Sequence, residues 1–134
     1  MNKKKLSTAQ EVFDYVVRGI VKQGRPAIRD VGNSCGFRVN SKKYGRLKCA
    51  AGMLLTDAEA QYTTGLSWNG LISAKLRPER LAPFDLLIVQ LQQAHDNESA
   101  FNVTGKFIER FLSRAAKIAT KNGLSMPDLS PPSE

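Results

Sequence analysis

The sequence is poor in the residues that most often carry chemistry. Its 134 residues include two cysteines, Cys35 and Cys49, and a single histidine, His95. Two cysteines are too few for a disulfide scaffold, so thiols or metal ligands are the expected roles. The chain has no glycine-rich loop of the Walker or Rossmann type, which removes the commonest nucleotide-binding motifs.

Long apolar runs are also missing. No stretch approaches the roughly 20 apolar residues of a membrane-spanning helix, so no membrane partner is expected. Residues 1–5 are basic and are followed by polar residues instead of an apolar signal core. This pattern predicts a protein of the bacterial host cytoplasm, of bacterial or phage type.

Positive charge is abundant and uneven. Twenty Lys and Arg against twelve Asp and Glu give a net charge of +8. Residues 1–50 hold twelve basic and three acidic residues, residues 51–100 hold three and six, and residues 101–134 hold five and three. A balance of this size predicts an anionic partner, such as nucleic acid or an acidic protein, and does not define a fold.

Helical periodicity dominates the rest of the pattern. Thr8 and Glu11 form a capping box for a helix over residues 8–23, and Gly24 ends it. A second capping box at Thr56 opens a short helix that reaches residue 62.

Later segments continue the helical pattern. The segment 64–76 is ambiguous, and helices are expected over 83–95 and from 100 or 101 to 121. Together these predict an α+β, mainly α fold with about five helices. Residues 1–124 would form one globular domain, and residues 125–134, rich in Pro and Ser, a disordered tail.

Two short alternating segments around a polar turn predict a β-hairpin at about residues 35–49. A turn centred near Lys42 would pair residues whose numbers add to about 84, which would make Cys35 and Cys49 cross-strand neighbours. Aromatic and basic residues mix here, as in ribbons that follow a phosphate backbone, although a solvated polar tip has the same composition. The candidate binding residues are Arg38, Lys42, Lys43, Arg46 and Lys48.

The last predicted helix carries a basic stripe. At about 100° per residue, five basic residues fall within a sector of roughly 80°, beside a sector of apolar residues. A solvated helix more often interleaves Glu with Lys, so the stripe indicates an anionic partner; an ordinary solvated face is the alternative. The stripe consists of Lys106, Arg110, Arg114, Lys117 and Lys121.

His95 lies on the apolar face of its predicted helix, next to Asp96, and three interpretations stay open. Cys49 and His95 could form a nucleophile and its base, with Asp57 or Asp96 orienting the imidazole. Cys35, Cys49, His95 and a carboxylate could bind zinc, although no paired C-x₂-C is present. His95 could instead be a core histidine bonded to the backbone, with small buried cysteines and no cofactor.

The motif residues also carry a resemblance. The strings CGFR (35–38), GRLKCAAGMLLTDAE (45–59) and LLIVQLQQAHD (86–96) are similar to the pattern C-x-Y-R…G-x-K-C-A-x-G-x-L-I-x-D-x-E-Y…L-L-x-x-L-Q-x-x-H-D. That pattern is typical of a family of small uncharacterised proteins from phages, prophages and bacteria. The resemblance implies that Cys49, Gly52, Asp57, His95 and Asp96 fall on the family's recurring positions, and it implies no activity.

The chain departs from this pattern at residue 37, where Phe replaces the usual Tyr, and in a longer, more basic hairpin turn. We therefore expect a phage- or mobile-element-type accessory protein, not an enzyme. It would bind nucleic acid, or a host complex that handles nucleic acid, through the basic hairpin and the helix stripe. The alternatives are an inhibitor of an acidic host protein, for example a defence component, and a Cys/His/Asp enzyme or zinc-stabilised domain.

Overall fold

Five α-helices and one β-hairpin make up the part of the chain that the computed structural model describes, residues 6–28, 36–62, 66–98 and 105–129. The expected α+β, mainly α fold is confirmed. The elements are α1 (Ala9–Gln23), β1 (Arg38–Ser41), β2 (Gly45–Lys48), the 3-10 helix η1 (Ala51–Leu54), α2 (Asp57–Gln61), α3 (Trp68–Ser73), the 3-10 helix η2 (Glu79–Phe84), α4 (Asp85–Glu98) and α5 (Phe107–Lys121).

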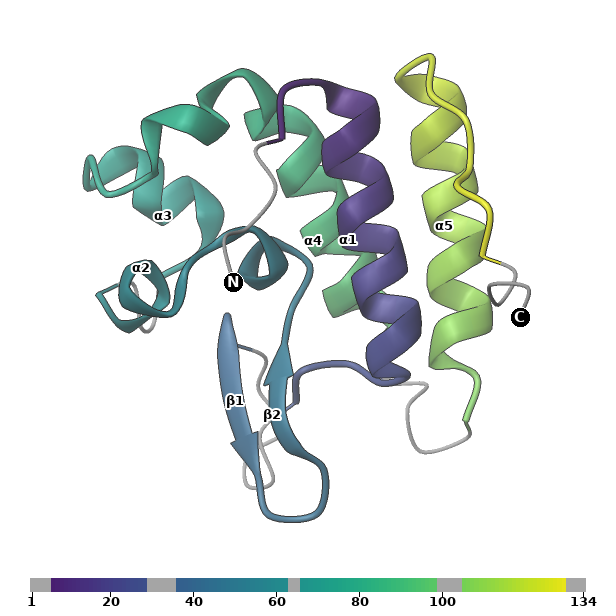
Figure 1. Cartoon of the computed structure of the whole chain (residues 1–134), viewed down its shortest axis with the longest axis horizontal. Coiled ribbons are helices and arrows are strands. Elements are labelled where there is room, and N and C mark those ends of the chain that lie inside the picture. Colours follow the sequence, from purple (N-terminus) through teal and green to yellow (C-terminus); the bar gives the residue numbers. More distant parts are fainter. Residues whose placement is uncertain (1–5, 29–35, 63–65, 99–104, 130–134) are drawn as a thin grey trace.

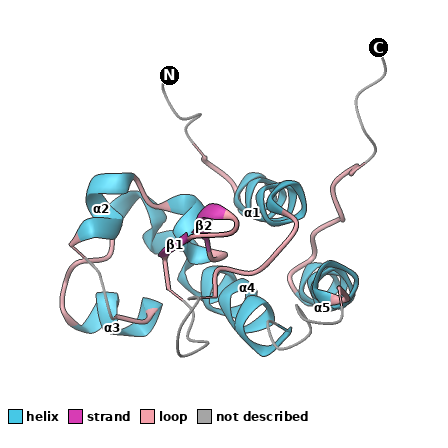
Figure 2. Ribbon diagram, turned by 90° about the horizontal axis from the view of Figure 1, so that it is seen from below, coloured by secondary structure: helices cyan, strands magenta, loops and turns pink. Residues whose placement is uncertain are grey.

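The three long helices form one side of the molecule, and the short elements gather on the other (Figure 1). Viewed end-on, α1, α4 and α5 stand at the corners of a triangle (Figure 2). Their facing residues are buried, in the periods that the sequence predicts. The core of these helices consists of Val12, Phe13, Val16, Val17, Ile20, Leu87, Ile88, Leu91, Ala94, Phe107, Phe111, Ala115 and Ala119.

Local signals set the ends of α1. The Thr8 side chain accepts a hydrogen bond from the Glu11 amide, and the Glu11 side chain reaches back to the Thr8 amide. Gly24 closes the helix in the left-handed region at φ +80°, where a residue without Cβ meets no steric penalty. The predicted capping box and stop are therefore confirmed, and the second capping box, at Thr56, is confirmed too.

The later helix boundaries differ from those predicted. Pro83 lies inside η2 and not at the first position of α4, which begins at Asp85 and continues past His95 to Glu98. The α5 helix begins only at Phe107, after Gly105 has turned the chain at φ +74°. The start expected at residue 100 or 101 lies outside the described residues.

The ambiguous segment 64–76 contains the short helix α3. Trp68 and Leu71 of the expected apolar face are buried, whereas Ile72 and Leu76 are exposed. The Trp68 indole donates to Asp85 Oδ1 at 2.8 Å, which ties α3 to the start of α4. Two of the four residues expected on the apolar face are therefore buried.

The predicted hairpin forms, but its turn centre lies one residue further along the chain than predicted. Arg38 pairs with Lys48 and Ser41 with Gly45, so opposite residues add to 86 and the turn centres on Lys43. Gly45 allows the tight turn because its backbone adopts φ +77°, a conformation that residues with a side chain rarely adopt. The register argument for a Cys35–Cys49 pair is therefore wrong, and Cys35 itself lies outside the described residues.

Part of the predicted tail contacts the body of the protein. Ser125 exchanges two backbone hydrogen bonds with the Gln10 side chain, at 2.8 and 3.0 Å, and Leu129 packs against the core. Residues 130–134 lie outside the described part of the chain. None of the helices described in the structure combines the length and the apolar character needed to cross a membrane.

Candidate nucleic-acid interface

His95 is fully buried, and both of its ring nitrogens are engaged within the protein. Its Nε2 accepts a hydrogen bond from the Ala27 amide at 3.0 Å, which places the ring proton on Nδ1. Nδ1 then donates to Asp96 Oδ1 at 2.9 Å. Gln92 donates to the same carboxylate oxygen at 2.7 Å and accepts from the Ala51 amide at 2.8 Å. This network joins two segments to α4: the chain that follows α1, through Ala27, and η1, through Ala51.

The geometry of His95 corresponds to the third interpretation, a core histidine bonded to the backbone. Cys49 is also buried, and its Sγ accepts a hydrogen bond from the Gly52 amide at 3.3 Å. Within the described ranges no three His, Cys, Asp or Glu side chains are grouped so that they could hold a metal ion. Cys35, the third zinc candidate, is outside those ranges.

Arg38, a predicted binding residue, contacts the protein itself. Its guanidinium donates to the carbonyls of Gly52 at 2.6 Å and Leu55 at 2.8 Å, and to Asp57 Oδ1 at 3.1 Å. This pairing lowers the pKa of the Asp57 carboxyl, chiefly through the Arg38 hydrogen bond. Gly52 is required because a Cβ there would overlap the Phe37 carbonyl oxygen. Arg38 therefore braces β1 against η1.

A second arginine, Arg80, also braces η1. Arg80 donates to the Leu54 carbonyl at 3.0 Å and to both carboxylate oxygens of Glu59, at 2.6 and 2.8 Å. The Arg80 hydrogen bond is the main cause that lowers the pKa of Glu59 from 4.5 to about 2. Arg38 and Arg80 thus hold the backbone of η1 and of the residue that follows it in place.

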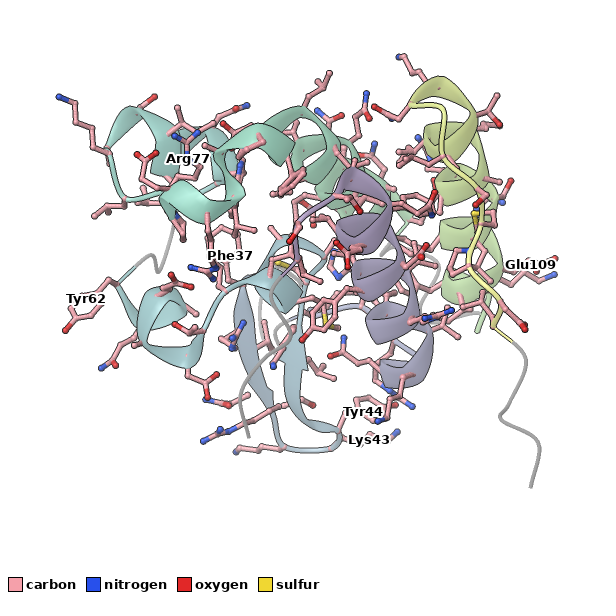
Figure 3. The ribbon with its side chains drawn as sticks, turned by 45° about the horizontal axis from the view of Figure 1, so that its top comes forward. Phe37, Lys43, Tyr44, Tyr62, Arg77 and Glu109 are labelled. Carbon is pink, nitrogen blue, oxygen red and sulfur yellow. The ribbon has the colours of Figure 1, made fainter. Side chains whose placement is uncertain are left out.

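The hairpin tip is the first basic surface that remains, and we define it as Arg25, Lys42, Lys43, Tyr44 and Arg46. The Arg25 guanidinium lies 3.5 Å from the centre of the Tyr44 ring, and Lys43 Nζ lies 5.4 Å from it. Lys43, through its hydrogen bond, is the main cause that lowers the Tyr44 pKa. Figure 3 shows Lys43 and Tyr44 side by side near the end of α1.

Two of the five hairpin residues predicted to bind a partner, Lys48 and Arg38, are less accessible than the other three. Lys48 is half-buried at the base of β2, where its backbone amide and carbonyl both bond to the Gln23 side chain. Arg38 is braced as described above. Arg25, in contrast, was not predicted, because its contact with Tyr44 joins residues 19 positions apart and leaves no local pattern.

An open groove between α4 and α5, of about 650 Å³, is the second basic surface. All five residues of the predicted stripe line it, together with two acidic residues, Glu98 and Glu109, so that the lining has a net charge of +3. The α4 side contributes mainly the amides of Gln90, Gln93 and Asn97. The basic residues are Lys106, Arg110, Arg114, Lys117 and Lys121.

Glu98 is a residue of the groove that the sequence analysis did not single out. It is 3% exposed, and its two carboxylate oxygens accept from Arg110 Nε at 2.8 Å and from Arg114 Nε. Both arginines lower the Glu98 pKa, Arg110 most. Their side chains stay about half exposed, at 48% and 49%. The buried carboxylate therefore fixes two guanidinium groups one turn apart at the edge of the groove.

Comparison with models of known families, with curated proteins and with solved structures finds no match for this chain.

Proposed function

We propose that the protein binds nucleic acid through phosphate contacts in the α4–α5 groove, with the hairpin tip as a second contact. The observation that carries the proposal is the gathering of all five cations of the basic stripe along one groove with a net charge of +3. A concave surface with an excess of positive charge concentrates the field and attracts polyanions more strongly than scattered charges do. The resemblance to small phage and prophage proteins fits an accessory role.

The hairpin tip supports the same partner by a different route. Arg25 and Tyr44 present a stacked cation and ring with Lys43 beside them, and Lys42 and Arg46 are exposed in the same hairpin. Basic groups mixed with aromatic rings suit a nucleic-acid backbone and its bases. In contrast, the buried and fully bonded imidazole of His95 offers no base for a nucleophile, which favours binding over catalysis.

Fluorescence anisotropy with a labelled oligonucleotide, at about 50 and about 200 mM salt, tests the proposal. Lys117→Glu with Lys121→Glu should weaken binding at least about tenfold, because two phosphate contacts become repulsive. The matched control is Lys22→Glu with Lys75→Glu, which makes the same charge change at exposed residues outside the groove and the hairpin tip.

Lys22 lies in the last turn of α1 as Lys121 lies in the last turn of α5, so both variants remove a favourable helix-end charge. Equal loss in both variants would mean that only net charge matters and would contradict an interface at the groove. No binding by the wild-type protein at the lower salt would contradict the proposal altogether. Lys43→Glu with Arg46→Glu examines the hairpin tip separately, and a weaker complex is expected.

A further inference from the structure

The two walls of the groove differ in chemistry, and this difference bears on which form of nucleic acid fits. Cations line the α5 wall, whereas the α4 wall presents the amides of Gln90, Gln93 and Asn97. We infer that the groove takes a single strand, with its phosphates on α5 and its base edges against the amides of α4. This inference rests on the proposed function and narrows its partner to single-stranded nucleic acid.

A duplex does not suit this geometry. The major groove of duplex DNA is about 12 Å wide and admits a single helix or a two-stranded ribbon. A helix with its side chains is already about 10–12 Å across, and α4 packs beside α5, so the pair is too wide to enter (Figure 2). The cations line an open groove between the two helices, so a strand that lies along the groove can reach all five of them.

The amide wall is suited to unpaired bases. The Gln93 and Asn97 side chains are exposed about one helical turn apart and make no hydrogen bond to any other residue within the described ranges. Gln90 accepts from Asn122 at 2.8 Å through its oxygen. Amides can pair with the Watson–Crick edges of bases, which are accessible only when the bases are unpaired. Amides also read bases in the major groove of a duplex, but α4 would have to enter that groove to do so and it packs beside α5, so here the amides favour a single strand.

The cationic wall has a definite length. From Lys106 to Lys121 the stripe spans about 22 Å, at about 1.5 Å per residue. At about 3.4 Å per nucleotide, the spacing of a stacked strand, this length corresponds to at most six or seven nucleotides, and a strand with unstacked bases spans it with fewer. Glu98 fixes Arg110 and Arg114 in the middle of the stripe, so the central phosphates meet guanidinium groups that are already placed.

Competition anisotropy with single strands and duplexes of the same sequence, about 12 nucleotides long and made as DNA and as RNA, tests the inference. The wild-type protein should bind at least one of the single strands, DNA or RNA, at least about tenfold more tightly than the duplex of the same sequence. Gln93→Ala with Asn97→Ala should reduce single-strand affinity about tenfold and leave duplex affinity and its salt dependence unchanged. Asn69→Ala, an exposed amide on α3, is the control and should change neither.

The outcomes separate this inference from the proposed function. Equal affinity for single strands and duplexes, weakened by Lys117→Glu with Lys121→Glu, would overturn the single-strand inference and leave nucleic-acid binding intact. An unchanged single-strand affinity of the amide variant would also overturn it. Absence of binding to every probe would overturn the proposed function itself. Thermal melts of each variant show that loss of binding is not loss of folding, since all of these positions are on the surface.

Discussion

Replacement of His95 tests whether the single histidine supports the fold. The Ala27 amide is fully buried and donates to His95 Nε2, and the imidazole meets the Phe107 ring edge-on at 5.6 Å between centroids. His95→Leu keeps a side chain of similar size but leaves that amide without an acceptor. A buried unsatisfied donor costs about 1–3 kcal/mol, which is the destabilisation expected for this variant.

His95→Ala should cost more, because it also opens a cavity beside Phe107. Large-to-small substitutions in a core indicate about 2–4 kcal/mol for that cavity, so the total loss is about 3–7 kcal/mol. Domains of this kind have a free energy of unfolding of about 5–15 kcal/mol, so His95→Ala should be close to unfolding at moderate temperature.

Urea denaturation followed by circular dichroism measures these losses. The control is Gln93→Ala, an exposed substitution on the same helix that should stay within about 0.5 kcal/mol of wild type. Wild-type stability of His95→Leu would refute the stabilising role of the Ala27–His95 hydrogen bond. It would reopen a role for the histidine outside the fold.

Three further predictions concern the η1 region and its neighbours. Gly52→Ala should destabilise the protein by several kcal/mol, about 2–4, because backbone must move to admit the Cβ; a Tm equal to wild type would contradict the close approach. The lowered pKa of Glu59 means that its pairing with Arg80 stabilises the fold above about pH 4.5, and that this is lost as pH falls toward 2. In Glu59→Gln, the loss of unfolding free energy between pH 6 and pH 3 should be smaller than in the wild type by about 1 kcal/mol, as urea midpoints at the two pH values would show. In a Cys35→Ser background, Cys49 should react with iodoacetamide far more slowly in folded than in urea-unfolded protein, because it is buried; fast reaction in the folded state would support the nucleophile interpretation.

The sequence predicts those features that depend on neighbours along the chain. The ends of α1 follow from Thr8, Glu11 and Gly24, which act within one turn of the helix. The α5 stripe follows from helical periodicity alone, and the same periodicity explains why its five cations reach one groove. His95 was expected to point inward, and it does so with no exposed surface.

Features that depend on contacts between distant segments could not be predicted from the sequence. Arg38 looks like any exposed cation in a hairpin, and only the return of residues 52–57 beside β1 gives it partners. Glu98 would have been predicted to face inward if the predicted helix over 83–95 had been continued to residue 98. It continues the inward spacing of Leu91, Ala94 and His95, and it was missed because the predicted helix stopped at residue 95.

The number of phosphates that the groove engages is the most direct test of nucleic-acid binding. The slope of log affinity against log salt is about −0.7 per phosphate contact for single strands, so three to five contacts give about −2 to −3.5. Lys117→Glu with Lys121→Glu should reduce the steepness by about 1.4, and Lys22→Glu with Lys75→Glu should keep the wild-type slope. A wild-type slope near zero, or one that both variants change equally, would contradict a phosphate-binding groove between α4 and α5.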